Sequence, residues 1–148
     1  MKKIILMVIL SLSVYLTNAQ RKDVTIKDIP QAVANSFTNA YHSVKTEWRK
    51  VGNDFEAAFE DNGTRTYVVY DNNGKLVRKE VTIKSETLPS GSIEYIKTTY
   101  GNNEVKQVRK ITDASGKVIY RATVKESRLY FDDNGKFIRT EKIEVDED

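Results

Sequence analysis

The sequence predicts an α+β fold built as a tandem duplication, in which one helix and a four-stranded antiparallel meander occur twice. Three observations support this prediction: a repeated segment, two amphipathic helices that each start at a proline, and short alternating strands separated by turns rich in Asn and Gly. Two copies side by side would form a sheet of about eight antiparallel strands with both helices on one face.

The strongest signal is the repeated segment. Residues 70–78 read YDNNGKLVR and residues 131–139 read FDDNGKFIR, so each aromatic, turn, aliphatic and basic position has a counterpart. The copies are about 61 residues apart, which is far longer than a solenoid repeat and indicates a duplicated half-domain. We place the two repeats at about residues 24–84 and 85–144.

Each repeat is expected to begin with a helix. Asp28-Ile29-Pro30 is typical of a helix start, because Asp can cap the first amides and Pro gives up a donor that the first turn does not use. Apolar residues then recur at every fourth position, which predicts one apolar stripe packed on a sheet: Ile29, Val33, Phe37 and Tyr41. The second repeat has the same start signal in Thr87-Leu88-Pro89 and a similar stripe in Leu88, Ser92, Ile96 and Tyr100, in which only the polar Ser92 weakens the match. Gly101 is expected to end this helix.

Short segments rich in Val, Ile, Tyr, Phe and Thr follow each helix, with a turn about every ten residues. Asn and Gly in these turns tolerate a positive φ. We expect strands near residues 44–51, 55–60, 64–70 and 75–83 in the first repeat, and near 105–112, 118–125, 128–131 and 136–143 in the second.

The first residues have the composition of a secretory signal. A short basic start is followed by an almost unbroken apolar run over residues 4–16 and by Thr17-Asn18-Ala19. A run of about 13 residues is too short to span a bilayer of about 30 Å but fits the core of a signal peptide. We therefore expect residues 1–19 to be removed by cleavage between Ala19 and Gln20. The single domain 20–148 would then be periplasmic or secreted and not inserted in the membrane.

The composition argues against several function classes. The chain has no cysteine and one histidine, His42, so no thiol nucleophile and no site built from Cys and His ligands can form. The net charge is +3, and subtracting the charges of Lys2 and Lys3 leaves +1 with no basic block, which argues against nucleic-acid binding. We expect no enzyme activity, no catalytic residue and no cofactor.

The acidic turns at Asp71 and Asp132 resemble fragments of calcium loops. A calcium loop of the EF-hand kind needs ligands spread over about twelve residues, and the next strand begins before that spacing is complete. We expect the aspartates to accept hydrogen bonds from turn amides instead, with Gly in the left-handed position, and we predict no metal site.

The third strand of each repeat indicates which residues face away from the helices. Val68 and Tyr70 match Leu129 and Phe131, and these apolar positions should face the helices. The face left open to water would then carry Tyr67, Val69, Arg128 and Tyr130. Tyr and Arg are enriched in contact surfaces, which favours partner binding, although Tyr also favours strands on either face.

Trp48, the only tryptophan, belongs either to the core or to a contact surface. Large aromatic side chains are usually buried, which favours packing against the helix. Its counterpart in the second repeat is Val108 or Arg109, depending on where the gap is placed.

Several motifs together resemble a known family: Ile29-Pro30 and Leu88-Pro89 at the helix starts, Glu47-Trp48, the segment 55–59 (FEAAF) and the terminal Asp-x-Asn-Gly hairpin. The chain is similar to exported PepSY-like proteins, also described as β-lactamase-inhibitor-like. The resemblance implies two helix-and-sheet halves with a concave sheet that grips a partner, and restraint of a peptidase or other hydrolase.

We therefore expect an exported, non-catalytic binding module that contacts another envelope or secreted protein through the open sheet face, as an inhibitor or regulator of a hydrolase. The alternative is a periplasmic carrier of a small ligand or peptide, with a pocket between the sheet and the helices.

Overall fold

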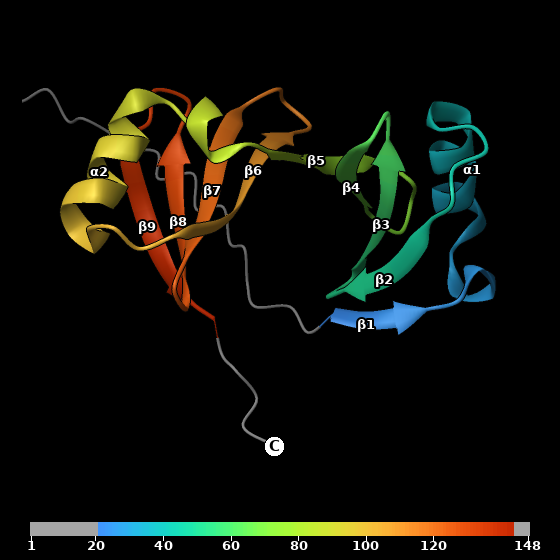
Figure 1. Cartoon of the computed structure of the whole chain (residues 1–148). Helices are drawn as coiled ribbons and strands as arrows, with labels where there is room; N and C mark the ends of the chain where they lie inside the picture. The colour runs from blue at the N-terminus through green and yellow to red at the C-terminus, as the bar shows by residue number, and fades with distance from the viewer. Residues whose placement is uncertain (1–20, 144–148) are drawn as a thin grey trace, which may run out of the picture.

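The structure, a computed structural model, describes residues 21–143. They form one curved sheet with two helices (Figure 1). The predicted signal peptide and its cleavage site between Ala19 and Gln20 lie outside the described residues. The strands are β1 Arg21–Val24, β2 Glu47–Val51, β3 Asp54–Asp61, β4 Thr64–Tyr70, β5 Leu76–Ile83, β6 Val105–Asp113, β7 Val118–Val124, β8 Ser127–Asp132 and β9 Phe137–Lys142. The helices are α1 Gln31–Ala40 and α2 Ser90–Tyr100, each preceded by a short 3₁₀ helix, η1 Ile26–Asp28 and η2 Ser85–Thr87.

The sheet is antiparallel throughout, and its strand order follows the sequence from β1 to β9. The predicted succession of a helix and a four-stranded meander, twice over, is confirmed. The ninth strand is β1, which pairs with β2 and which the sequence did not reveal, because its residues RKDV are mostly charged and exposed. β5 has the same place in the second repeat as β1 in the first: it precedes the 3₁₀ helix and pairs with the strand after the α-helix.

Both helices cover the same face of the sheet, as predicted. Val33 and Phe37 of α1 pack in a core with Trp48, Phe59 and other side chains of β2 to β4. α2 covers the second core, which contains Leu88, Ile96, Val108, Ala122, Val124, Leu129 and Phe131. In Figure 1 the helices lie at the two outer ends, so they are on the convex face and the concave face looks into the space between the halves.

The helix starts differ in detail from the prediction. Pro30 and Pro89 have extended ψ angles of 139° and 142° and precede the first helical residues. Asp28 does not cap α1; its carboxylate accepts hydrogen bonds from the amide (3.1 Å) and hydroxyl (2.7 Å) of Thr25 and so closes η1. The extended proline separates the 3₁₀ turn from the helix, which keeps Asp28 away from the helical amides. Gly101 ends α2 with a φ of +63°, as predicted.

The repeated Asp-x-Asn-Gly segments form the turns that were predicted. Asp71 accepts hydrogen bonds from the amides of Asn73 (2.9 Å) and Lys75 (3.0 Å), and Gly74 has a φ of +77°. Asp132 makes the same contacts to Asn134 (3.0 Å) and Lys136 (2.8 Å).

Each of these turns presses against the helix of its own repeat. A Cβ added to Gly74 would lie 2.4 Å from the carbonyl oxygen of Ala32 in α1. A Cβ added to Gly135 would lie 2.8 Å from Pro89 Cβ and 2.9 Å from the amide nitrogen of Ser92. The repeated segment therefore packs the last turn of each meander against the start of the helix in the same repeat.

The turn at Gly116 provides a control. Asp113 accepts hydrogen bonds from Ser115 and Lys117 in the same pattern, and Gly116 has a φ of +87°, but an added Cβ would meet no atom within 4 Å. Gly116→Ala should lower the free energy of unfolding by about 1 kcal/mol from the left-handed backbone alone. Gly135→Ala should cost roughly 1–3 kcal/mol more, because the methyl group overpacks the contact with α2. Chemical denaturation measures both losses, and equal losses would contradict the tight contact.

Candidate functional site

The concave face is the side of the sheet that points away from α1 and α2. The registers place Tyr67 and Val69 on this face, opposite Glu80 and Arg78 of β5. They also place Arg128 and Tyr130 there, opposite Glu141 and Arg139 of β9. These four positions therefore lie on the side that strand alternation predicts, and their part in partner binding stays a prediction.

The expectation that this face is open to water is wrong for three of the four positions. Tyr67 is 7% exposed, Val69 0% and Tyr130 2%, and only Arg128 is partly exposed. The guanidinium of Arg109 lies 3.7 Å above the ring of Tyr67, and that of Arg139 lies 4.0 Å above Tyr130. The alternation of residues along a strand predicts which side of the sheet a residue faces. It does not predict that the side chains of Arg109 and Arg139 cover the two tyrosine rings.

Trp48 lies on the helix face and belongs to the first core. It is 8% exposed, and its ring meets Phe37 edge-to-face at 5.1 Å. Its backbone partner is Val24 at the end of β1, just as Val108 pairs with Ile83 at the end of β5. Val108 is therefore its counterpart in the second repeat, which decides between the two alternatives.

The middle of the concave face holds one carboxylate surrounded by three arginines. Glu80 Oε1 accepts a hydrogen bond from Arg78 Nε at 2.9 Å. Its Oε2 accepts from Arg109 Nη1 at 2.9 Å and from Arg121 Nη2 at 3.1 Å. The side chain of Glu80 is 1% exposed, so four charges from β5, β6 and β7 meet almost without water. We call these four residues the Glu80 cluster.

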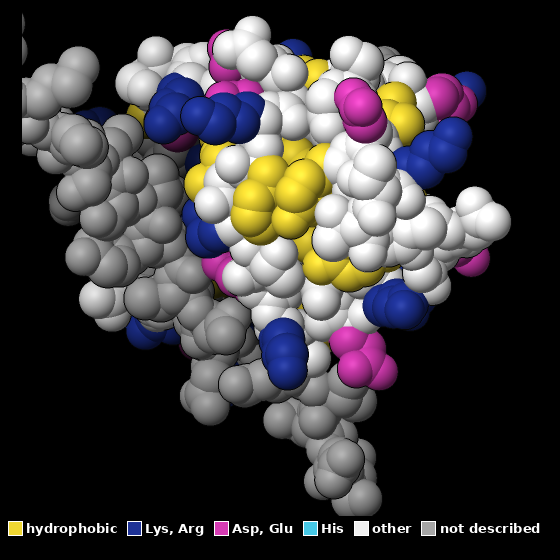
Figure 2. All heavy atoms as spheres, turned by 90° about the vertical axis from the view of Figure 1, so that its left-hand side faces the viewer, with side chains coloured by type: hydrophobic (Ala, Val, Ile, Leu, Met, Phe, Trp, Pro, Cys, Tyr) yellow, Lys and Arg dark blue, Asp and Glu magenta, His cyan; other side chains and the backbone are white. Residues whose placement is uncertain are grey.

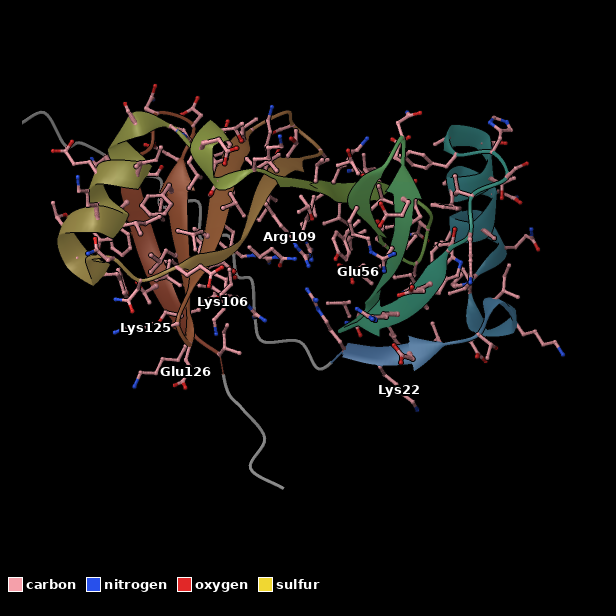
Figure 3. The ribbon with its side chains drawn as sticks, in the orientation of Figure 1. Lys22, Glu56, Lys106, Arg109, Lys125 and Glu126 are labelled. Carbon is pink, nitrogen blue, oxygen red and sulfur yellow. The ribbon has the colours of Figure 1, made fainter. Side chains whose placement is uncertain are left out.

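A second carboxylate, Glu56 of β3, is also buried on this face but is not satisfied. Its side chain is 0% exposed, and neither oxygen has a hydrogen-bond partner among the described residues. The nearest cation in that set is Arg21 at 3.7 Å. Figure 3 shows Glu56 and Arg109 on opposite halves, with their side chains directed into the space between them.

A groove of about 680 Å³ lies elsewhere, between α1 and the edge formed by β1 and β2. Its lining residues include Phe37 of α1, Tyr41 just after that helix, Trp48 and Arg49 of β2, and Ile26 of η1. It has the position of the pocket between sheet and helix that a carrier would need.

Within residues 21–143, no helix is long and apolar enough to cross a membrane. In the same part of the chain, no three His, Asp or Glu side chains are grouped so that they could hold a metal ion.

The model of one protein family matches residues 15–78 and again residues 53–139, and it is described as "Putative beta-lactamase-inhibitor-like, PepSY-like". The chain belongs to the PepSY-like family. The two matches overlap and together span both repeats, which confirms the resemblance found in the sequence. No curated protein matches this PepSY-like chain.

Solved structures from Bacteroides share the fold. A protein from Bacteroides eggerthii DSM 20697, described as a putative periplasmic protein, has a TM-score of 0.70 and 17% identity over 77% of this chain and 88% of its own. A DUF2874 family protein from Bacteroides uniformis ATCC 8492 has a TM-score of 0.69 and 18% identity over 77% and 89%. A BLIP-like protein from Bacteroides fragilis NCTC 9343 has a TM-score of 0.62 and 20% identity over 80% and 90%. At such identities the likeness shows the fold of the PepSY-like chain.

One pair of the Glu80 cluster has an equivalent in the second repeat of the PepSY-like chain. Arg78 donates from Nε to Glu80, and Arg139 donates from Nε to Glu141 at 3.1 Å in the equivalent place. β5 lies in the middle of the sheet, whereas β9 is an edge strand, and Glu141 keeps 19% of its side-chain exposure. Extending the sequence repeat from Arg78 and Arg139 by two residues would have revealed both carboxylates.

The charges around Glu80 change its acidity. Burial alone would raise the pKa of Glu80, but the positive charges of Arg121, Arg78 and Arg109 outweigh burial and lower the pKa from 4.5 to about 2. Burial and the neighbouring charge of Arg121 lower the pKa of Arg109. Glu80 is therefore ionised at neutral pH and holds the three cations together.

The cluster predicts a pH-dependent contribution to stability. Glu80→Gln should lower the free energy of unfolding at pH 7 by about 3–5 kcal/mol, because three arginines lose their common anion. Since the pKa of Glu80 is lower in the folded than in the unfolded chain, its stabilisation is complete above about pH 5 and is lost as the pH falls toward about 2. The difference between the native chain and Glu80→Gln should therefore shrink over this interval in urea denaturation.

Glu60→Gln is the matched control. Glu60 lies on β3, and its side chain is 59% exposed, so its removal should change stability by no more than about 0.5 kcal/mol. A Glu80→Gln effect that is equally large at pH 7 and at pH 2 would contradict the role given to the ionised carboxylate.

Proposed function

We propose that this chain is an exported, non-catalytic binding module that uses its concave face to hold another envelope or secreted protein and to restrain a hydrolase. Two findings support the proposal: membership of a family described as "Putative beta-lactamase-inhibitor-like, PepSY-like", and similarity in fold to a protein described as putative periplasmic. The signal peptide predicted from the sequence agrees with both. Catalysis is not needed to account for any of the buried charged residues described above.

The observation that carries the proposal is the composition and rigidity of the concave face. Neither helix covers it, and its centre is made of tyrosines and arginines, the residue types that dominate the energetic centres of protein interfaces. Arg109 is fixed between Glu80 and the ring of Tyr67, at 2.9 Å and 3.7 Å. Side chains that are already ordered lose little entropy on binding. Because Arg109 and Tyr67 are each 7% exposed, a partner would contact mainly the partly exposed side chains around them, such as Arg65 and Arg128.

The side of the molecule that carries α2 has no comparable candidate interface among the described residues. Figure 2 shows the side on which α2 lies, where apolar atoms form small areas interrupted by polar and charged groups. The exposed large hydrophobic residues are spread over different elements, with Ile26 in η1, Leu76 in β5, Ile93 in α2 and Ile138 in β9. Single exposed apolar residues are common on monomeric proteins and do not define an interface.

The rim of the concave face is charged but balanced. Arg65 lies 2.8 Å from Glu47, and Arg139 lies 2.9 Å from Glu141, each arginine with 30% of its side chain exposed. These pairs can exchange partners with a bound protein at small cost, because exposed ion pairs contribute only about 0–1 kcal/mol each. A polar rim around a rigid aromatic and arginine centre is the usual anatomy of a specific interface.

A second candidate function is the carriage of a small ligand or peptide. The groove of about 680 Å³ beside α1 favours it, because ligand pockets commonly have volumes of about 300–1,000 Å³. This function would use the other face of the sheet. Native mass spectrometry of the protein purified from its cells tests it: a bound small molecule that is lost in Thr38→Trp, which fills the groove, would support the carrier.

Photo-crosslinking in the cells that make the protein tests the binding module. A photoreactive amino acid at position 65 or 128 on the concave face should form an adduct of one defined protein mass. The matched control is position 97, because Lys97 is exposed on α2. Adducts that form equally well from position 97, or from none of the three positions, would overturn the proposal.

A further inference from the structure

Glu56 is a carboxylate placed where a folded protein rarely leaves one. It lies in β3 on the concave face, its side chain is 0% exposed, and both of its oxygens lack a hydrogen bond within the described residues. A buried charge is tolerated when it is paired, and a buried acceptor without a donor is costly. The orphaned oxygens therefore need an explanation.

The basic neighbours of Glu56 on β1 and β2 do not form hydrogen bonds with it. Arg49 stands opposite Glu56 in the ladder between β2 and β3, yet its guanidinium pairs with Asp23 at 3.0 Å and with Glu47 at 3.8 Å. Arg21 approaches to 3.7 Å, which is too far for a hydrogen bond. Both oxygens of Glu56 therefore accept no hydrogen bond within the described residues, although Arg49 lies directly opposite on β2.

The Glu80 cluster beside it has no comparable surplus of acceptors. Both oxygens of Glu80 are used, by Arg78 at one and by Arg109 and Arg121 at the other. The unpaired buried polar atom of that cluster is a donor, Arg109 Nε. Across the described part of the concave face, the buried side-chain atoms without a hydrogen-bond partner are therefore the two oxygens of Glu56, the hydroxyl of Thr82 and Nε of Arg109.

We propose that Glu56 is the binding site for a basic side chain, lysine or arginine, of the partner protein. This inference rests on the proposed function and names the chemistry that the concave face recognises. An arginine can donate two parallel hydrogen bonds to one carboxylate, and a lysine ammonium can donate three, so either group matches the orphaned oxygens. Arg109, on the opposite half, is directed toward the same side as Glu56 (Figure 3), and its Nε–H has no acceptor among the described residues.

An acidic partner group fits less well. It would lie beside the charge of Glu56, and the arginines that could receive it already share Glu80. Like charges close together in a water-poor site repel strongly. The unfilled hydrogen-bonding capacity thus selects a donor over an acceptor.

Two small probes test the proposal without knowledge of the partner. The ¹⁵N-labelled protein is titrated at low ionic strength with N-acetyl-argininamide and, separately, with sodium acetate. N-acetyl-argininamide should give saturable shifts of the amides of β3 around Glu56, and acetate should not. Glu56→Gln should weaken the binding by about tenfold or more, because the charge-assisted pair is lost.

Controls separate binding from folding. Glu60→Gln changes the same residue type on the same face of β3 at an exposed position and should leave the affinity unchanged. Glu56→Asp keeps the charge and should retain measurable binding even if Glu56→Gln is poorly folded. Thermal unfolding of each variant identifies the folded ones.

Two outcomes overturn the inference: no saturable shift with N-acetyl-argininamide, or equal affinity in the native chain and Glu56→Gln. If acetate binds saturably and N-acetyl-argininamide does not, the site binds an anion and the inference is wrong. If crosslinks form from positions 65 and 128 but the titration fails, the binding module stands and only its chemistry is wrong. If the titration succeeds and no crosslink forms, the site stands and the proposed function fails.

Discussion

The contact between Glu80 and its three arginines organises the concave face. Arg78 lies on the same strand, Arg109 and Arg121 come from the next two strands, and Arg109 reaches back over Tyr67 on β4. Four neighbouring strands are thus joined by side chains across the junction of the two repeats. Because a buried charge that loses its partner costs several kcal/mol, these side chains have few other arrangements available. We infer that this contact sets how the two halves of the sheet face each other.

The duplication has become asymmetric where function is proposed. The ladder Val24, Trp48, Ala57 and Val68 of the first repeat corresponds to Ile83, Val108, Ala122 and Leu129 of the second. Glu56 precedes Ala57 and Arg121 precedes Ala122, so equivalent positions carry opposite charges. Arg121 is paired with Glu80, whereas Glu56 is left without a donor. The two halves therefore share a scaffold and present different chemistry to a partner.

Most of the architecture could be predicted from the sequence because it depends on local patterns. The stripe of Val33 and Phe37, the positive φ of Gly74 and the alternation in β4 each follow from neighbouring residues. β1 was missed because its short, charged sequence RKDV has no apolar alternation. It is held by pairing with β2, which is distant in the sequence: Asp23 and Arg49, for example, are 26 positions apart.

The candidate site was predicted only in part. Alternation placed Tyr67 and Tyr130 on the side away from the helices, but it could not reveal that Arg109 and Arg139 cover their rings. Glu80 and Arg121 are 41 positions apart, and nothing local in either segment indicates their contact. These charged side chains meet only when strands that are far apart in the sequence pair in the sheet, and a single segment does not encode that pairing.

The central claim is that Glu80 sets the relative position of the two halves. The chain has no cysteine, so spin labels on Asn39→Cys in α1 and Lys97→Cys in α2 report one distance without background labelling. Double electron–electron resonance should give a narrow distance distribution for the doubly labelled chain and a broader or shifted one after Glu80→Gln. An unchanged distribution in a folded Glu80→Gln variant would contradict the claim.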